Sequence, residues 1–320
     1  MSSISVCATV KNDADAVEEL ISDLKNQTRL PDEVVVVDGG STDGTDVRLA
    51  AGLEGWTSFE LIHFPGSNIS QGRNRAVAAS SGDMVALLDA GLRLKPEWLE
   101  SLAGALESGG SADVVFGYVL SRPAGFFESV LGAVTIRDES EIDPDEYQPS
   151  AGSLAFRREF LEECIFPEWL DFGEDMYLDL KWRAEGRRLV HASGADVGFR
   201  PRRNLRAFFR QYFNYAKGDG RAGMWWSRHL IRYCSYAMGI WLCVLAPGRP
   251  VVLVLLAVGG LAYLRGPYRR LARLIPRMSP QAALAAVALV PAIRAVGDVA
   301  KMLGFLVGLN EARKTGRPQG

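Results

Sequence analysis

Cysteine is scarce in this 320-residue chain, and its placement excludes two kinds of crosslinked domain. The four cysteines are Cys7, Cys164, Cys234 and Cys243. None of them forms a CxxC pair, and two lie in the apolar C-terminal part of the chain. We therefore expect neither a disulfide framework nor a zinc site, because reduced cysteines in a protein facing the cytosol fit this pattern better.

The N-terminal stretch MSSISVCATVKND lacks the basic segment and the long apolar segment of a signal peptide. The chain also has no internal repeats, and its low-complexity sequence is confined to a short polar C-terminal stretch. We therefore expect any membrane attachment to come from the C-terminal part of the chain.

Acidic residues are almost missing from the last third of the chain. Residues 200–320 hold 20 Lys and Arg but 3 Asp and Glu, a net charge of +17, whereas residues 1–199 hold 16 and 35, a net charge of −19. The overall net charge of −2 hides this asymmetry, which indicates two parts that face different environments. The positive charges flank apolar runs, so they favour a membrane surface over nucleic acid as a partner.

Strand patterns and helix patterns alternate along the first 120 residues. The strand-like segments are residues 4–10, 32–39, 59–64, 83–91 and 112–120. The helix-like segments are residues 13–27, 45–53 and 96–108, and residues 70–80 are expected to form a loop that leads into a helix. This alternation predicts an α/β fold with right-handed βαβ units and a mostly parallel sheet flanked by helices. Four valines at positions 34–37 predict a strand that is buried on both faces.

Two aspartates follow strand-like segments at the points where ligands bind in such folds. Asp38 ends the segment of four valines, and Asp89 ends the segment 83–91 in the stretch LLDAG. Ligands sit beyond the carboxyl ends of parallel strands, so both carboxylates, together with the end of the first strand, are expected to face a ligand crevice.

The C-terminal part contains two apolar runs, residues 230–246 and 251–264, separated by the turn PGRP and flanked by arginines. Each run is at or below the ~17–25 residues that usually cross a bilayer, so tilted spans and a re-entrant hairpin both fit. The flanking arginines place both ends on the cytoplasmic side. Residues 280–309 are apolar but interrupted by charges, which fits an interfacial helix or a third span. A soluble helical core is the alternative for the whole region.

Three motifs occur in an order that resembles one enzyme family. VVVVDGGSTDGT starts at residue 34, GRNRAVAASSGDMVALLDAG at residue 72, and GEDMYLDLKWRAEGRRLV at residue 173. Together they resemble glycosyltransferase family 2, the inverting transferases with the nucleotide-sugar-binding GT-A fold, over roughly residues 4–200. The resemblance and the apolar runs together lead us to expect four parts. They are a GT-A domain at 1–200, a basic and aromatic interfacial segment at 201–229, a membrane-associated region of two to three apolar helices at 230–310, and a polar tail at 311–320.

The resemblance implies where the donor nucleotide binds. The expected contacts from the first loop are Thr9, Lys11 and Asn12. Asp38 would contact the base, since a carboxylate accepts hydrogen bonds from a base N–H and the following glycines let the backbone approach a ligand. Arg73 would donate charge-assisted hydrogen bonds to the diphosphate, while Arg75 is expected at the surface. The alternative role for Asp38 and for Asp43 in the same turn is to hydrogen-bond the backbone of the turn or to cap a helix, and we assign this role to Asp43.

The stretch LLDAG occupies the place of the family's metal-binding DXD motif but departs from it. Asp89 keeps the first acid, whereas Gly91 replaces the last one. One carboxylate alone makes a poor metal cage, although Mg²⁺ can bind through few protein ligands together with phosphates and waters. A divalent metal, Mg²⁺ or Mn²⁺ held by Asp89, and a metal-independent mechanism in which Asp89 contacts the ribose therefore both stay open.

The resemblance implies that Asp175 is the general base of an inverting transfer. It would take the proton from the acceptor hydroxyl while that oxygen attacks the anomeric carbon, and Glu174 would orient the acceptor or the loop. The alternative for both acids is capping of the helix that follows them. The segment containing Ala151, Gly152 and Ser153 is expected beside the donor sugar.

The basic and aromatic segment at 203–223 resembles one that lies on lipid headgroups in membrane-associated members of the family. Its residues Arg210, Gln211 and Arg221 are candidates for contacts with the diphosphate or the membrane. His191 lies upstream of this segment, and we expect it to be structural.

These observations predict a membrane-associated inverting glycosyltransferase whose catalytic domain faces the cytoplasm. It would transfer sugar from a nucleotide-sugar donor to a lipid-linked glycan or to polyprenyl phosphate, with membrane lipids but no nucleic acid as further partners. Two alternatives are a non-catalytic membrane scaffold, favoured by Gly91, and a processive polysaccharide synthase, which the missing QxxRW motif disfavours.

Overall fold

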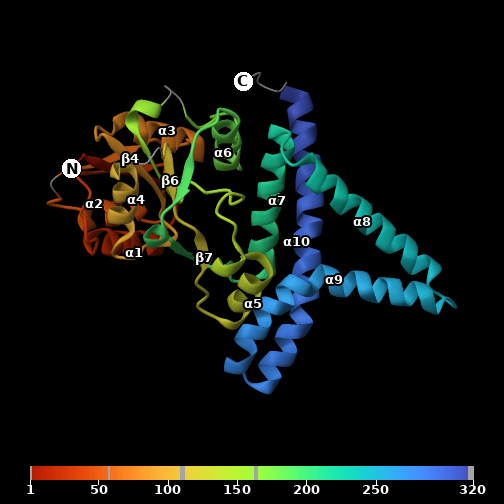
Figure 1. The fold of residues 1–320 in the computed structure, drawn as a ribbon. Helices are drawn as coiled ribbons and strands as arrows, with labels where there is room; N and C mark the ends of the chain where they lie inside the picture. The colour runs from red at the N-terminus through yellow and green to blue at the C-terminus, as the bar shows by residue number, and fades with distance from the viewer. Residues whose placement is uncertain (1, 57, 109–111, 162–164, 316–320) are drawn as a thin grey trace. The chain divides into compact units, whose positions relative to one another are not determined.

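The structure is a computed structural model of the chain (Figure 1). It describes residues 2–56, 58–108, 112–161 and 165–315. It divides into two compact units, Met1–Leu120 with Glu139–Arg200, and Ser121–Asp138 with Pro201–Gly320. Cys164 lies outside the described residues, and the other three cysteines are free thiols.

A seven-stranded mixed sheet forms the centre of the first unit, with the strand order β3-β2-β1-β4-β8-β6-β9. Its strands are β1 (Ile4–Val10), β2 (Glu33–Asp38), β3 (Phe59–His63), β4 (Met84–Asp89), β6 (Val114–Phe116), β8 (Ser153–Arg157) and β9 (Leu189–His191). Strands β3, β2, β1 and β4 run parallel to one another. Strand β8 is antiparallel to β4 and β6, and β6 is parallel to β9. The predicted mixed and mostly parallel sheet is therefore confirmed.

Helices cover both faces of this sheet, as the run of valines in β2 predicts. Val34 and Val36 belong to the core that includes side chains of α1 (Ala14–Lys25), α2 (Thr45–Gly52) and α4 (Trp98–Glu107). Val35 and Val37 belong to the core on the other face, with α3 (Ile69–Ala79) and α6 (Glu174–Ala184). All four valines are buried because alternate side chains of a strand point to opposite faces.

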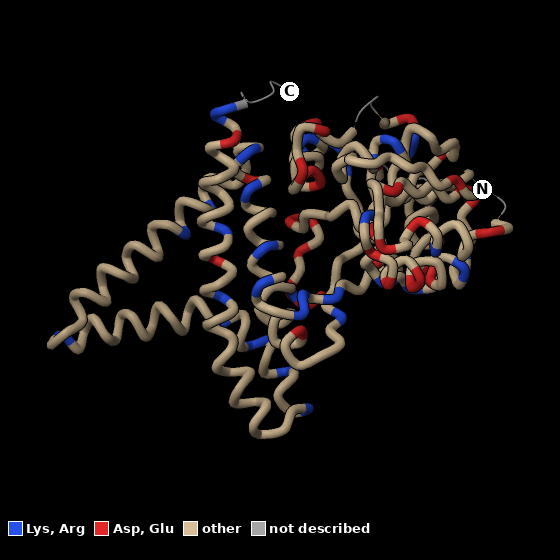
Figure 2. Tube along the Cα trace, turned by 180° about the vertical axis from the view of Figure 1, so that it is seen from behind, with Lys and Arg blue, Asp and Glu red and all other residues tan. Residues whose placement is uncertain are grey.

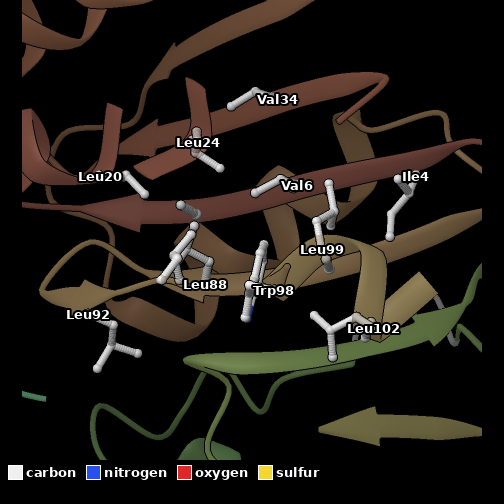
Figure 3. Close-up of a cluster of buried hydrophobic side chains, with 14 of the residues drawn as sticks. Ile4, Val6, Leu20, Leu24, Val34, Leu88, Leu92, Trp98, Leu99 and Leu102 are labelled. Carbon is white, nitrogen blue, oxygen red and sulfur yellow. The ribbon is translucent and has the colours of Figure 1, made fainter. Parts of the chain in front are cut away.

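Figure 3 shows the first of these cores at the level of side chains. Leu20 and Leu24 of α1 lie over β1 near Val6, and Trp98 of α4 lies near Leu88 of β4. Trp98 is completely buried and satisfies its indole N–H by donating to the Ser153 hydroxyl at 2.9 Å. This packing fixes the positions of the central strands, and with them the edge of the sheet where their carboxyl ends lie.

Helices α1, α2 and α4 begin and end within two residues of the predicted limits. Residues 70–80 were expected as a loop leading into a helix, but Ile69–Ala79 are helical as α3, which Asn68 and Gln71 open with a capping box. The predicted strand 112–120 is divided into β6 and β7 (Val119–Ser121). Strand β7 joins a second sheet, of order β5-β10-β7, with β5 (Leu92–Arg93) and β10 (Val197–Phe199). This small sheet was not predicted, because strands of two or three residues are too short to show a periodic pattern.

The second unit consists of helices. They are α5 (Phe126–Thr135), α7 (Leu205–Ala222), α8 (Trp226–Leu245), α9 (Pro250–Leu274) and α10 (Pro280–Thr315). Helices α7 and α10 lie side by side, and α8 and α9 extend from them and meet at the turn that joins them (Figure 1). Helix α5, which comes from a segment within the predicted first domain, packs against α9 and α10 of this unit.

Glycines allow α7 and α10 to approach closely. Gly304 and Gly308 of α10 lie against the backbone carbonyls of Phe213 and Lys217, and Gly220 of α7 lies against the backbone of Phe305. A Cβ atom at any of these three positions would overlap the facing backbone. Close contact through small residues one turn apart is typical of helix pairs in membranes.

Two helical segments, Pro250–Arg277 and Pro280–Lys314, are long and apolar enough to cross a membrane. Large apolar side chains of α8 and α9 are exposed, for example Ile240, Val244, Val251 and Leu261. Figure 2 shows that Asp and Glu are spread through the first unit, whereas Lys and Arg predominate on α7 and α10. The apolar arms α8 and α9 carry few charges near the turn that joins them.

Candidate functional site

The ends of three parallel strands bring the predicted donor-site residues to one edge of the sheet. Val10 of β1 is in register with Asp38 of β2, and Thr9 is in register with Asp89 of β4. The loops after these strands therefore share the carboxyl edge, where ligands of open α/β sheets bind.

Asn12 ties the loop after β1 to the loop after β2. Its backbone is left-handed, with φ 52°, a conformation that Asn tolerates better than most residues. Its side-chain carbonyl oxygen accepts a hydrogen bond from the backbone amide of Thr42 at 2.8 Å. The backbone amide of Asn12 donates to the Ser41 hydroxyl at 2.9 Å. This cross-link gives the predicted nucleotide loop a defined shape.

Asp38 is buried at the end of β2 and bonds to its own turn. Its carboxylate accepts hydrogen bonds from the amides of Gly40 and Ser41 and from the Ser41 hydroxyl. The His63 imidazole lies 3.7 Å away. The carboxylate therefore holds the glycine-rich turn in place, and the predicted contact with a base stays a prediction. Asp43 accepts hydrogen bonds from Thr45 and from the Ala14 amide, the cap chemistry expected of it.

Thr9 and Lys11 lie on the same loop in different environments. The Thr9 hydroxyl donates to the Val37 carbonyl at 3.3 Å and packs against Gly72 at the start of α3, where a Cβ would overlap it. Lys11 is exposed at the edge of the sheet. Of the two, Lys11 is the side chain that is open to a phosphate.

Arg73 connects three parts of the first unit. It projects from α3, bonds to Asp89 Oδ1 at 2.6 Å and pairs with Glu174 at the start of α6. Its side chain is 4% exposed, and its guanidinium lies 5.3 Å from the centre of the Phe166 ring. The two carboxylates raise its pKa despite burial, so the guanidinium stays charged. The predicted contact of Arg73 with a diphosphate stays a prediction, whereas its pairing with both carboxylates is seen directly. Arg75, one residue beyond Asn74 on the same helix, is exposed as expected.

Glu174 and Asp175 open α6 after Gly173, which has a left-handed backbone (φ 77°). Glu174 is buried, and Asp175 is partly exposed. Burial raises the pKa of both carboxyls, and Arg73 opposes this shift. Asp175 accepts a hydrogen bond from the Met176 amide at 2.8 Å, so it also serves its own helix start. A partly exposed carboxylate with a raised pKa is a suitable proton acceptor.

Gly152 lies against the carboxylate of Asp89, and Ser153 lies deeper in the core. A Cβ atom on Gly152 would overlap Leu92 Cδ1 and lie 3.1 Å from Asp89 Oδ2, so a larger residue here would have to displace these side chains. Ser153 is completely buried, accepts from Trp98 and donates to the Ala195 carbonyl at 2.7 Å. Gly152 thus lies at the edge of the sheet next to Asp89, whereas the Ser153 hydroxyl is used in hydrogen bonds inside the first unit.

The remaining predicted residues come from other elements of the chain. Arg210, Gln211 and Arg221 are on α7 of the second unit, and Gln211 donates to the Tyr215 hydroxyl at 2.7 Å. Their contacts with diphosphate or lipid stay predictions. His191 bonds to the buried Asp196 at 2.8 Å and stacks on Tyr118, an arrangement that suits the structural role expected of it.

Within the part of the chain that the structure describes, no group of three or more His, Cys, Asp or Glu is placed to hold a metal ion by itself. Asp89 offers one carboxylate at the carboxyl edge, with its side chain 39% exposed. Sequence reasoning missed the pairing of Arg73 with both Asp89 and Glu174. No local pattern signals it, because Arg73 and Glu174 are separated by 101 residues.

Comparison with known proteins places these features in a family. The model of the family described as Glycosyl transferase family 2 matches residues 5–164, half of the chain. Glycosyltransferase AglE of Haloferax volcanii is 25% identical over 247 residues, which cover 75% of this chain and 80% of that protein. Pre-mycofactocin glycosyltransferase of Mycobacterium tuberculosis is 28% identical over 217 residues, 63% of this chain and 44% of that protein.

A solved structure is similar over nearly the whole chain. Mannosyltransferase PcManGT from Pyrobaculum calidifontis, determined in complex with GDP-Man and Mn²⁺, aligns with a TM-score of 0.55 over 98% of this chain and 87% of that one. The sequence identity is 20%, so the likeness bears on the fold alone. Together with the family match, it confirms the predicted GT-A fold followed by apolar helices.

Proposed function

This chain belongs to glycosyl transferase family 2 and is a glycosyltransferase that uses a nucleotide-sugar donor, and we propose that it transfers the sugar with inversion to an acceptor held in a membrane. One observation carries the proposal. Arg73 joins Asp89, at the strand ends where the donor is expected, to Glu174, the neighbour of Asp175. Arg73 thereby holds the edge of the sheet where the donor is expected close to Asp175, the proposed proton acceptor.

In the proposed reaction Asp175 is the general base. The acceptor hydroxyl gives its proton to the Asp175 carboxylate while its oxygen forms a bond to the anomeric carbon. The bond between that carbon and the diphosphate oxygen breaks, and the electron pair leaves with the nucleoside diphosphate. The partial exposure of Asp175 and its raised pKa support this role. Glu174 is buried against Arg73 and is assigned to positioning.

The donor is proposed to bind at the carboxyl edge of β1, β2 and β4. The cross-linked loops at Asn12 and Asp38 would shape the nucleotide site, and Lys11 would face the phosphates. PcManGT was solved with GDP-Man, which supports a nucleoside diphosphate sugar of this general kind for this chain.

A divalent cation, Mg²⁺ or Mn²⁺, is proposed to accompany the donor. Mg²⁺ is usually held by one or two carboxylates together with substrate phosphates and waters. The Asp89 carboxylate, which is partly exposed at this edge, is a ligand of this kind and therefore fits such an ion. When bound, the cation would neutralise charge on the departing diphosphate. The Mn²⁺ in the PcManGT complex supports this assignment.

The acceptor is proposed to be a lipid-linked glycan or polyprenyl phosphate. Two helical segments long and apolar enough to span a membrane, and the exposed apolar side chains of α8 and α9, support attachment to a bilayer. Arginines near the ends of these helices support a cytoplasmic position for the catalytic unit. Such attachment would keep an acceptor that cannot leave the bilayer near Asp175.

A buried polar network in the helical unit adds to the membrane proposal. Asp298 of α10 is 5% exposed and accepts hydrogen bonds from Arg232 at 2.9 Å, from Tyr236 and from Tyr263. Ionisable groups inside membrane helices usually face the bundle interior and pair with one another. This pairing suits helices that associate within a bilayer.

Donor binding by the detergent-purified full-length protein tests the enzymatic part of the proposal. UDP-, GDP- and TDP-sugars are titrated by calorimetry with and without Mg²⁺ or Mn²⁺. We expect saturable binding of one donor. Failure of every donor under every condition would contradict the proposal and favour a non-catalytic scaffold.

Product analysis tests the acceptor. The labelled donor is incubated with the enzyme and a total lipid extract, or with soluble sugars, and an Asp175→Asn protein serves as the inactive control. We expect label in the organic phase for the active enzyme alone. Transfer to soluble acceptors with none to lipid would contradict a membrane-held acceptor.

A further inference from the structure

One face of α6 carries three charged residues spaced four apart, Asp175, Asp179 and Arg183. Residues at this spacing lie on the same side of a helix, one turn after another. The side chain of Asp179 is 1% exposed, and Arg183 donates to its Oδ1 atom through Nε at 2.9 Å. This ion pair holds the guanidinium in place and leaves its two NH₂ groups to bind other acceptors.

Both NH₂ groups of Arg183 bind the segment that precedes β8. Nη1 donates to the backbone carbonyl of Asp145 at 2.9 Å, and Nη2 donates to the backbone carbonyl of Tyr147 at 2.6 Å. Residues 142–152 belong to neither a helix nor a strand, so no regular ladder of backbone hydrogen bonds fixes them. Arg183 therefore attaches this segment to α6.

The same segment also contacts the end of α6 that carries Asp175. The backbone amide of the buried Ala151 donates a hydrogen bond to the Asp175 carboxylate. The chain from Tyr147 to Ala151 reaches about 13 Å when fully extended. Asp175 and Arg183 are separated by about 12 Å of helix. Because these two lengths match, residues 147–151 have little slack between their two attachments to α6.

The ring of Tyr147 is held separately from its backbone. Its hydroxyl accepts a hydrogen bond from the Val119 amide at 3.0 Å, and its ring stacks on Phe116 with the ring centres 5.6 Å apart. Burial raises the pKa of Tyr147 to about 12, so the hydroxyl stays protonated. These contacts fix the ring, whereas Arg183 binds the carbonyl through which the chain continues toward Ala151.

We propose that Arg183 is a positioning residue for sugar transfer, because it holds the Asp145 and Tyr147 carbonyls so that the Ala151 amide stays on the carboxylate of residue 175. A general base must lie within hydrogen-bond reach of the hydroxyl whose proton it takes, and a fixed N–H donor keeps the carboxylate in one orientation. The proposal rests on the assignment of Asp175 as the general base proposed above.

Loss of this attachment should change the titration of Asp175 in a known direction. Burial raises the pKa of Asp175, and the hydrogen bond from Ala151 lowers it in part. Without that hydrogen bond the pKa should rise further. The protonated carboxyl then stabilises the folded protein up to a higher pH than in wild type, and this stabilisation is lost as pH rises through the new folded pKa.

Thermal melting of four full-length proteins in detergent, across acidic and neutral pH, measures this change without any substrate. The proteins are wild type, Asp175→Asn, Arg183→Lys and the double variant. Lysine keeps a positive charge beside Asp179, but one ammonium group cannot reproduce the planar fork of an arginine. We expect the pH range over which Asp175→Asn gains stability to lie higher in the Arg183→Lys background than in wild type. The same pH range in both backgrounds would overturn the proposal.

Arg187→Lys is the matched control, because Arg187 pairs with Glu185 at 3.1 Å, just beyond the end of α6. It should leave the pH range unchanged. With the nucleotide sugar that the wild type uses, Arg183→Lys should lower kcat by at least about tenfold through misplacement of the base, with the donor KM unchanged. A wild-type kcat in Arg183→Lys would also overturn the proposal. Absence of transfer by the wild-type protein would instead contradict the proposed function, which the melting comparison does not use.

Discussion

Arg73 and Glu174 form a buried ion pair between α3 and the first residue of α6, 101 residues apart in the sequence. Both side chains are at most 5% exposed. Arg73 also binds Asp89 at the end of β4, so one guanidinium links the donor edge of the sheet to the Glu174–Asp175 pair. The geometry of the candidate site therefore depends on a single buried cation.

Removing this cation should destabilise the protein strongly. Arg73→Ala leaves two carboxylates without their partner, one of them buried, and breaking a buried pair in this way costs about 3–5 kcal/mol. We expect the free energy of unfolding from urea titration to fall by that amount. Arg75→Ala, on the exposed side of the same helix, is the matched control and should change it by less than about 0.5 kcal/mol. Equal stability of the two variants would contradict the role of Arg73.

Activity should depend on pH through Asp175. Burial raises the pKa of Asp175 and nearby Asp89 adds to the shift, although Arg73 opposes it. The base works when deprotonated, so kcat/KM should rise with pH through a value above the ~3.9 of an ordinary aspartate. A pH profile measured with saturating metal checks this. An acidic limb at or below pH ~4 would show that the site does not raise the pKa.

The same shift predicts a change in stability of known sign. The folded state binds the Asp175 proton more tightly than the unfolded state does, since its pKa is raised. The stabilisation is complete below the unfolded pKa and is lost as pH rises through the folded pKa. Asp175→Asn should therefore gain stability relative to wild type as pH rises through this window. Parallel melting curves at acidic and neutral pH measure the difference, and a constant gap would speak against it.

Asn12 should matter for both its backbone and its side chain. Its φ of 52° is easy for glycine, and its carbonyl oxygen holds the Thr42 amide. Asn12→Gly loses the two hydrogen bonds from Thr42, whereas Asn12→Ala loses them and also strains the backbone by about 1–3 kcal/mol. We expect Asn12→Ala to melt below Asn12→Gly and both to bind donor more weakly than wild type. Identical melting of the two variants would exclude backbone strain at this position.

The helical unit should be sensitive to added methyl groups between α7 and α10. Gly304→Ala places a Cβ against the Phe213 carbonyl, and overpacking of this kind costs about 1–3 kcal/mol. Gly239→Ala on α8 is the control, because nothing lies within 4 Å of its added Cβ. It should be neutral or stabilise by up to about 1 kcal/mol through helix propensity. Thermal melting in detergent compares them, and an unchanged Tm for Gly304→Ala would show that the helices can separate without cost.

The central sheet and its first helices could be predicted from local patterns. The four valines of β2 require cover on both faces, and the structure divides them between two cores. The alternation of strands and helices predicts that the strands run parallel, which places Asp38 and Asp89 at one edge of the sheet. These features follow from periodicity and topology, which a sequence carries directly.

Contacts between distant segments could not be predicted in the same way. The double pairing of Arg73 and the bond of Ser153 to Trp98 depend on tertiary packing. The capping of α1 by Asp43 shows the limit clearly. Asp13 occupies the N-cap position of α1, whereas Asp43 of the neighbouring loop supplies the carboxylate that bonds to the first turn.

The rate of sugar transfer by Asp175→Asn, compared with wild type at saturating donor, acceptor and metal, tests the central assignment most directly. Asparagine keeps the shape of the side chain but cannot accept the proton, and a general base contributes about 10²–10⁴-fold to the rate. The account predicts a loss of kcat in this range with donor affinity unchanged. A variant that transfers sugar at the wild-type rate would show that another group removes the acceptor proton.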